Sequence, residues 1–209
     1  MIEGEPEWDM FAWDLARFGD WADKAFTKAR VRDQYMHRFK IHFPNEEHAA
    51  GGPAMTRPAY EMQRGMGAVF GLNAGWEHPL WFADAPGTED TNGFARQNWF
   101  EPVGREAAML RDAVGVIDIS NFGKYEVTGP GAGDWPDALV ANHVPREIDK
   151  SCLPPLIGMR GGVAGDSTIT ITGDESYMMI GSCMAERYHR RFFDMVPLPD
   201  GPGVVVSTP

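Results

Sequence analysis

Two groups of residues have the types and positions needed for chemistry. The first is Asp166, which follows several glycines at the start of an alternating segment. Aspartate is uncommon in strands, and glycines let a second backbone or a ligand come close. An aspartate among threonines on the polar side of a strand is also often plain solvated surface, because aspartates are mostly exposed. Asp166 is therefore a candidate site residue with two readings that residue type alone leaves open.

The second group contains three histidines and two nearby glutamates: His37, His42, His48, Glu46 and Glu47. Imidazoles and carboxylates are common zinc ligands, but this spacing matches no zinc pattern. The sequence therefore favours surface and packing histidines, and we expect no metal site. Cys152 and Cys183 also lack a metal-like spacing, and we expect two reduced, packed thiols.

Several common signatures are absent from the sequence. It contains no GxxxxGK[ST] loop for phosphate binding and no GxSxG nucleophile elbow. No GxGxxG opens a βαβ unit, so we expect no dinucleotide site. The formal net charge of -11 disfavours binding to nucleic acid. The apolar runs are too short to cross a bilayer. The first residues resemble neither a secretory signal nor a transit peptide, so we expect no membrane partner and a cytoplasmic location.

A predicted β-hairpin positions Asp166. Residues 163–172 alternate, so that one face carries Val163, Gly165, Ser167, Ile169 and Ile171. The other face carries Ala164, Asp166, Thr168, Thr170 and Thr172. Gly173 and Asp174 form the turn, and Tyr177–Ile180 returns as an apolar strand. The two-residue period of a strand places Thr168 and Thr170 on the same side as Asp166.

Other periodicities predict an α+β fold with antiparallel strands. Residues 124–128 alternate with Tyr125 and Val127 on one side, which predicts a half-buried strand. Residues 116–119 are a short strand candidate, and Gly115 is the expected C-cap of the helix before it. Helical patterns cover residues 9–22, 24–39, 60–65, 104–114, 134–142 and 184–195. In the last of these, Tyr188, Phe192 and Met195 are expected on one side. Residues 43–58 read as an irregular connection.

Residues 99–106 read WFEPVGRE, and residues 113–130 read AVGVIDISNFGKYEVTGP. This combination resembles the opening of the folate-binding domain in the dimethylglycine and sarcosine dehydrogenase family. These enzymes are flavin oxidoreductases fused to a folate-binding domain. That domain is similar to the T-protein of glycine cleavage, which is an aminomethyltransferase. Residues 43–47 and 75–82 resemble the small connecting domain of that family. Residues 4–6 and 17–21 resemble the end of its flavin domain.

The resemblance implies a domain order for what looks like an internal fragment of such an enzyme. Residues 1–24 would be the tail of a missing FAD domain, residues 25–83 the connecting domain, and residues 84–209 the N-terminal part of the folate-binding domain. The implied fold is a truncated T-protein-like domain with an antiparallel sheet and flanking helices. One departure from the pattern is Asn121, which stands where the T-protein usually has a histidine.

The resemblance also implies a function. In the intact enzymes, FAD oxidises a small N-methyl amine to an iminium, and the methyl-derived carbon passes to tetrahydrofolate. This chain would be the folate-binding part of such an oxidative N-demethylase, with FAD only in the missing domain. We therefore do not expect the chain to oxidise a substrate by itself. An inert fragment, or a non-catalytic partner of a separate flavoprotein subunit, is the alternative. A weaker alternative is a T-protein-like demethylase or aminomethyltransferase that acts on another substrate.

The family pattern assigns site residues by their matching positions. Asp166 matches the acidic residue that orients the reactive folate nitrogens and stabilises positive charge, a catalytic role. Thr168 and Thr170 would line the same pocket. The remaining expected folate contacts are the apolar residues Phe122, Leu153 and Ile180. For these three, plain core packing is at least as good a reading.

Overall fold

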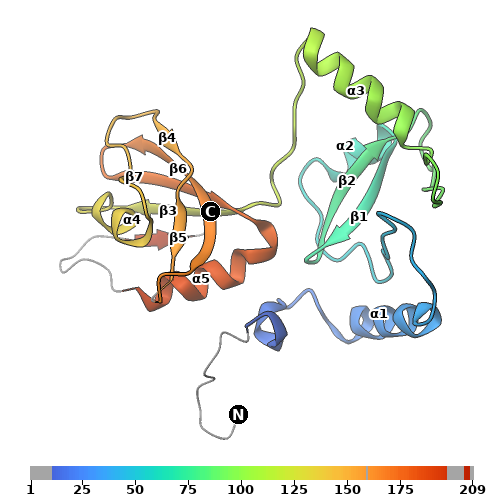
Figure 1. Cartoon of the computed structure of the whole chain (residues 1–209), viewed down its shortest axis with the longest axis horizontal. Coiled ribbons are helices and arrows are strands. Elements are labelled where there is room, and N and C mark those ends of the chain that lie inside the picture. Colours follow the sequence, from blue (N-terminus) through green and yellow to red (C-terminus); the bar gives the residue numbers. More distant parts are fainter. Residues whose placement is uncertain (1–10, 159, 197–204, 208–209) are drawn as a thin grey trace, which may run out of the picture. The chain divides into compact units, whose positions relative to one another are not determined.

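The computed structural model describes residues 11–158, 160–196 and 205–207. The chain divides into two compact units, one of residues 18–121 and one of residues 122–209 with residues 1–17. Figure 1 shows the elements of each unit. The domain boundaries predicted after residues 24 and 83 refer to the domains of the resembled family and not to these compact units. They stay a prediction. Among the described residues, no helix is both long and apolar enough to cross a membrane.

The unit of residues 122–209 is built on an antiparallel sheet of six strands. Its strands are β3 (Gly123–Thr128), β4 (Ser151–Cys152), β5 (Pro155–Ile157), β6 (Val163–Gly173), β7 (Ser176–Gly181) and β8 (Val205–Ser207). The strand order is β4-β6-β7-β3-β8, and β5 also pairs with β6. The predicted hairpin is the β6–β7 pair, and the predicted strand at residues 124–128 is β3. The α+β expectation is thus confirmed.

One face of this sheet forms the core. Tyr125 and Val127 of β3 are fully buried, as their alternation predicts, and Ile169 of β6 belongs to the same core cluster. Two helices contribute to the same core, α4 (Asp134–Leu139) and α5 (Glu186–Met195) (Figure 1). The Phe193 ring packs edge-on against Tyr125, at 4.9 Å between ring centroids. Removing these aromatic and aliphatic surfaces from water is the main stabilising contribution to the unit.

The buried face of α5 is set by three residues near its middle. The helix buries His189, Phe192 and Phe193, which follow the three- and four-residue spacing of a helix face. Met195, which the sequence places on the same side of the helix as Tyr188 and Phe192, is 56% exposed. The helical pattern at residues 9–22 corresponds only to two 3-10 turns, Phe11–Trp13 and Leu15–Arg17, and residues 9–10 lie outside the described part.

The unit of residues 18–121 contains three helices and one hairpin. They are α1 (Lys24–His37), α2 (Tyr60–Gly65), α3 (Phe100–Asp112), β1 (Ala68–Asn73) and β2 (Trp76–Phe82). The Asp23 carboxylate caps α1 by accepting a hydrogen bond from the Phe26 amide at 2.7 Å. The first two helices lie where the sequence predicts them, whereas α3 begins earlier than its apolar pattern.

The segment after α3 corrects two predictions. Ala113, not Gly115, is the C-cap of α3. A β-carbon on Gly115 would lie 2.0 Å from the Leu110 side chain, so this glycine accommodates a close approach rather than a left-handed backbone. Residues 116–119 do not form a strand, and the Val116 side chain is 98% exposed. The apolar residues of segment 116–119 are typical of a strand. A strand also needs a neighbouring strand for its backbone hydrogen bonds, and this segment pairs with none in the described part of the chain.

Candidate functional site

The β6–β7 hairpin presents the predicted site residues on the face of the sheet opposite the core. Ser167, Ile169 and Ile171 of β6 are buried, so the residues between them point the other way. In the β6–β7 register, Thr168 lies opposite Ile180 and Thr170 opposite Met178. Directly opposite residues share a face of the sheet. We call this surface the outer face and define it by Leu153, Asp166, Thr168, Thr170 and Ile180.

Leu153 joins the outer face through the β4–β5 edge. Ser151 pairs with Thr170 and Pro155 pairs with Asp166, which leaves Leu153 opposite Thr168 in the same register. Leu153 is 67% exposed, so core packing does not describe it, and Ile180 is half-buried. The structure thus brings these apolar and hydroxyl side chains into one row across the sheet.

Phe122 lies next to this surface along the chain. It immediately precedes Gly123 of β3, which pairs with Gly181 of β7. Gly181 in turn pairs with Ser167, the neighbour of Asp166. The Phe122 ring is 43% exposed and therefore is not a core residue. Phe122 and Asp166 consequently belong to the same end of the sheet.

The Asp166 carboxylate is exposed on the outer face. Within the described residues it has no hydrogen bond and no ion pair, although its charge acts on His189. Its partner across β5 is Pro155, which has no amide hydrogen to offer. By contrast, Thr170 already shares a hydrogen bond with Ser151, at 2.8 Å between their hydroxyl oxygens. Asp166 is therefore an acidic group of this surface that has no partner among the described residues and can meet a ligand.

His189 lies beneath the strand that carries Asp166, and sequence reasoning missed it. The residue is 1% exposed, and neither ring nitrogen has a hydrogen-bond partner among the described residues. A β-carbon on Gly165 would lie 2.6 Å from Nε2 of His189, and one on Gly181 would lie 3.0 Å from Nδ1. The helical spacing from His189 to Phe192 and Phe193 was the available signal of burial.

The imidazole of His189 is held neutral by its surroundings. Burial lowers the pKa of His189, and the opposing effect of the Asp166 carboxylate is smaller. Ser167, beside it on the core face, also has a hydroxyl with no partner among the described residues. Gly165 and Gly181 therefore leave the space that the buried imidazole of His189 occupies.

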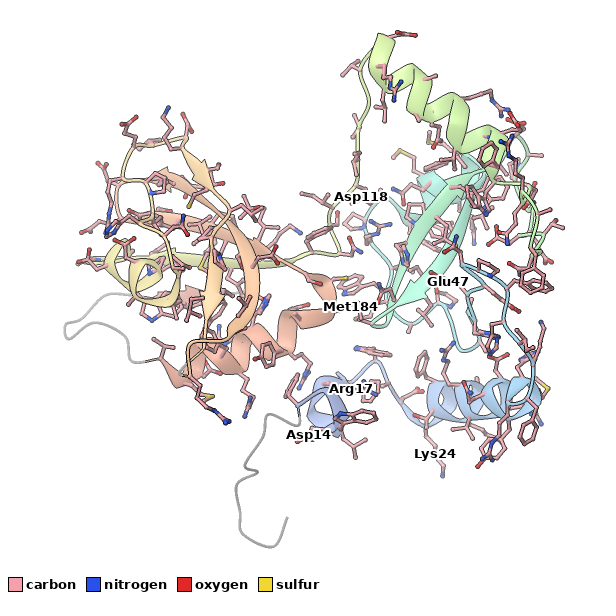
Figure 2. All side chains as sticks on the ribbon, in the orientation of Figure 1. Asp14, Arg17, Lys24, Glu47, Asp118 and Met184 are labelled. Carbon is pink, nitrogen blue, oxygen red and sulfur yellow. The ribbon has the colours of Figure 1, made fainter. Side chains whose placement is uncertain are left out.

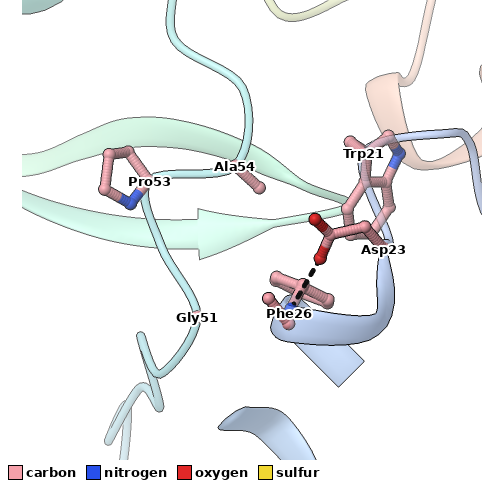
Figure 3. Close-up of a pocket in the computed structure, with 7 residues that line it drawn as sticks. Trp21, Asp23, Phe26, Gly51, Pro53 and Ala54 are labelled. Carbon is pink, nitrogen blue, oxygen red and sulfur yellow. Dashed lines mark hydrogen bonds between the residues drawn. The ribbon is translucent and has the colours of Figure 1, made fainter. Parts of the chain in front are cut away.

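The unit of residues 18–121 contains a separate open cavity of about 340 Å³ (Figure 3). It is lined by Trp21, Asp23, Ala25, Phe26, Gly51, Pro53 and Ala54. The carboxylate in this lining, Asp23, already accepts the capping hydrogen bond from the Phe26 amide. The lining offers no second titratable group, so this cavity has less chemistry to offer than the outer face.

Comparisons with known proteins match two family models to the chain. The family model of the GCVT N-terminal domain matches residues 59–206, more than half of the chain. The FAD dependent oxidoreductase central domain matches residues 3–56. In the solved structures, the glycine cleavage system aminomethyltransferase T from Bartonella henselae superposes with a TM-score of 0.54 at 20% identity. It covers 73% of this chain and 37% of that one. This likeness shows that the two proteins share a fold.

Curated relatives point to one family. Mitochondrial dimethylglycine dehydrogenase from Mus musculus is 30% identical over 99% of this chain and 24% of its own length. Mitochondrial sarcosine dehydrogenase from Homo sapiens is 26% identical over 89% of this chain and 25% of its own length. The chain thus spans about a quarter of these relatives. With its central-domain and GCVT N-terminal matches in sequence, the chain belongs to the dimethylglycine and sarcosine dehydrogenase family.

Proposed function

We propose that the outer face is one wall of a tetrahydrofolate site, and that the chain is the folate-binding part of an oxidative N-demethylase. The observation that carries the proposal is the Asp166 carboxylate. It has no hydrogen-bond or ion-pair partner among the described residues, and it lies on a surface that also presents Thr168 and Ile180. Membership in the dimethylglycine and sarcosine dehydrogenase family supports the choice of ligand.

The side chains of the outer face suit a flat ring system with nitrogen-bound hydrogens. The carboxylate of Asp166 and the hydroxyl of Thr168 can accept hydrogen bonds from ring N–H groups. Leu153 and Ile180 offer apolar surface to the ring, and Phe122 offers an aromatic face. Apolar walls with a few polar groups are typical of small-molecule sites.

The proposed mechanism assigns Asp166 an electrostatic role. Bound tetrahydrofolate supplies the nitrogens that accept the one-carbon unit. Asp166 orients these nitrogens, stabilises positive charge that develops during transfer, and can take up a proton as a general base. The sequence has no dinucleotide-binding motif, so we assign oxidation of the N-methyl amine, and the FAD it needs, to no residue of this chain.

Two further expectations stay proposals. We keep residues 84–209 as the folate-binding part, preceded by a connecting domain at residues 25–83 and a flavin-domain tail at residues 1–24. A cytoplasmic location also stays a prediction, since the named dehydrogenase relatives are mitochondrial.

Isothermal titration calorimetry of the 209-residue chain with tetrahydrofolate tests the proposal. Replacing Asp166→Ala should weaken binding about 10- to 100-fold, because a hydrogen bond to a charged group contributes about 1.5–3 kcal/mol. Asp166→Asn keeps the shape but removes the charge, and it should weaken binding in the same direction. Asp174→Ala removes an exposed carboxylate in the turn of the same hairpin, and it should leave binding unchanged.

The contrary results are clear. Absence of saturable binding up to millimolar tetrahydrofolate would rule out a folate wall in this chain and favour an inert fragment or a non-catalytic partner. Equal affinities for the wild type and Asp166→Ala would remove Asp166 from the site. Far-UV circular dichroism of each variant establishes that its fold is retained.

A further inference from the structure

The loop after α1 folds back toward the helix. It brings His42 and His48 close to His37, the last residue of α1. The Glu46 amide donates a hydrogen bond to the Phe43 carbonyl at 3.1 Å, which closes the loop. Arg30 of α1 donates to the carbonyl oxygen of His48 and fixes the end of the loop against the helix. The imidazole of His48 consequently lies between those of His37 and His42, at 5.2 and 4.8 Å between ring centroids.

Three potential ligand atoms of this loop converge. Nε2 of His48 lies 3.1 Å from Nδ1 of His42, and the latter lies 3.7 Å from Oε2 of Glu46. All three atoms lie within 4.8 Å of one another. Tetrahedral zinc with bonds of about 2.0–2.1 Å holds its ligand atoms about 3.3 Å apart, so one ion fits among these three with small side-chain shifts.

We propose that His42 Nδ1, His48 Nε2 and Glu46 Oε2 bind a zinc ion, leaving a fourth position open to water. Two imidazoles with one carboxylate favour zinc over magnesium or calcium, which prefer oxygen ligands alone. The proposal departs from the expectation of no metal that the sequence spacing gives. It rests on the unit of residues 18–121 and is independent of the proposed folate function.

Asp33 supports the proposed site from behind. Oδ2 of Asp33 lies 3.0 Å from Nδ1 of His48, on the far side of the ring from Nε2. This contact places the His48 proton on Nδ1 and leaves the lone pair of Nε2 for the metal. A carboxylate that orients a metal-bound histidine in this way is a regular feature of zinc sites. The other oxygen of Asp33 lies 3.2 Å from Nδ1 of His37.

Glu46 is held as a charged ligand. Its side chain is 7% exposed, and Lys40 Nζ lies 2.9 Å from Oε1. The hydrogen bond from Lys40, and next that from the Phe43 amide, lower the pKa of Glu46 to about 2. Oε2 accepts only the Phe43 amide among the described residues, at 2.9 Å, and therefore keeps a lone pair for a metal.

A second grouping shares His48 and must be distinguished. Asp33, His37 and His48 also bring one ligand atom each within 4.8 Å of the others. It would use Nδ1 of His48 and not Nε2. The two geometries therefore differ in whether His42 or His37 is a ligand, which two single variants can separate.

The test is titration of the metal-free 209-residue chain with zinc chloride by calorimetry, with visible spectra of bound Co²⁺ as a second readout. We expect a single zinc at micromolar affinity or tighter, and the bands of four-coordinate Co²⁺. His42→Asn and His48→Asn should each weaken zinc binding by more than about 100-fold, since loss of a supporting group alone costs about 10–100-fold. Asp33→Asn should fall in that lower range.

Two variants serve as controls. His143→Asn replaces a fully exposed histidine in the other unit and should leave zinc affinity unchanged. His37→Asn should keep the affinity and the Co²⁺ spectrum of the wild type. Zinc binding that is only millimolar, or equal in wild type and His42→Asn, overturns the proposal. Loss in His37→Asn with retention in His42→Asn also overturns it and moves the ion to the Asp33 side.

Discussion

At the scale of single residues, the contact between Gly165 and His189 fixes what can stand behind Asp166. A β-carbon at position 165 would meet Nε2 of a buried imidazole at 2.6 Å. The imidazole cannot move away easily, because Phe193 packs beside it at 6.2 Å between ring centroids. The strand that carries Asp166 can therefore have only a glycine at position 165, on its core side.

Gly165→Ala should destabilise the unit of residues 122–209 by about 1–3 kcal/mol, the usual cost of overpacking a core. Hydrogen exchange of the β6 and β7 amides measures the free energy of opening in this unit alone. Gly162→Ala is the matched control, because a β-carbon there meets no atom within 4 Å. Equal protection in both variants would show that His189 does not constrain the strand.

Residue-scale features were only partly predictable. The side of the strand taken by Asp166, Thr168 and Thr170 followed from the two-residue period, because that period is a property of the extended backbone. The burial of His189 did not follow, because a histidine is read as polar unless its helix face is known. The sequence left two readings open for Phe122 and Leu153, and only their exposure in the structure excludes core packing.

At the scale of elements, an ion pair between buried Arg57 and half-buried Asp118 anchors the irregular segment between α3 and β3. Arg57 donates to the Asp118 carbonyl at 3.0 Å, and its guanidinium lies 3.4 Å from the Asp118 carboxylate. Figure 2 marks the position of Asp118. Gln63 of α2 donates to the same carboxylate at 3.1 Å. Burial opposes ionisation of Asp118, but the hydrogen bonds from Ser120, together with Arg57 and Gln63, hold its pKa below the ordinary value.

Arg57→Met should free this segment, because it leaves the Asp118 carboxylate without its charged partner. Breaking a buried pair costs about 3 kcal/mol, so amides near residue 118 should exchange faster, by about two orders of magnitude. Arg64→Met provides the comparison, since its pair with Glu61 is exposed and contributes about 0–1 kcal/mol. The same exchange rate near residue 118 in the two variants would contradict the anchoring role.

Elements with a clean alternation were predictable from the sequence, and elements shaped by distant contacts were not. β6 and β3 alternate along their length, and β7 is a short apolar run after a Gly-Asp turn, so all three were predicted. The β1–β2 hairpin was missed, because Pro79 and Gly71 weaken the strand pattern. Gly71 is needed there for a tertiary reason: a β-carbon would lie 2.1 Å from the Glu47 carboxylate, which accepts the Leu72 amide at 3.1 Å.

At the scale of the whole molecule, the two candidate sites belong to different compact units. The outer face is part of residues 122–209, and the histidine loop is part of residues 18–121. Family resemblance predicted the first from motifs spread along the chain. The second depends on a loop closing onto α1, and the spacing of His37, His42 and His48 gives no sign of that closure.

The most direct test of the central claim maps tetrahydrofolate onto the chain by amide chemical shifts in two-dimensional NMR. We expect the shifts to concentrate at Asp166, Thr168 and Ile180, together with the residues around Leu153 and Phe122. Amides of α1 and of the β1–β2 hairpin should remain unchanged. Shifts confined to the unit of residues 18–121, or none at millimolar ligand, would contradict the assignment of the outer face as the folate wall.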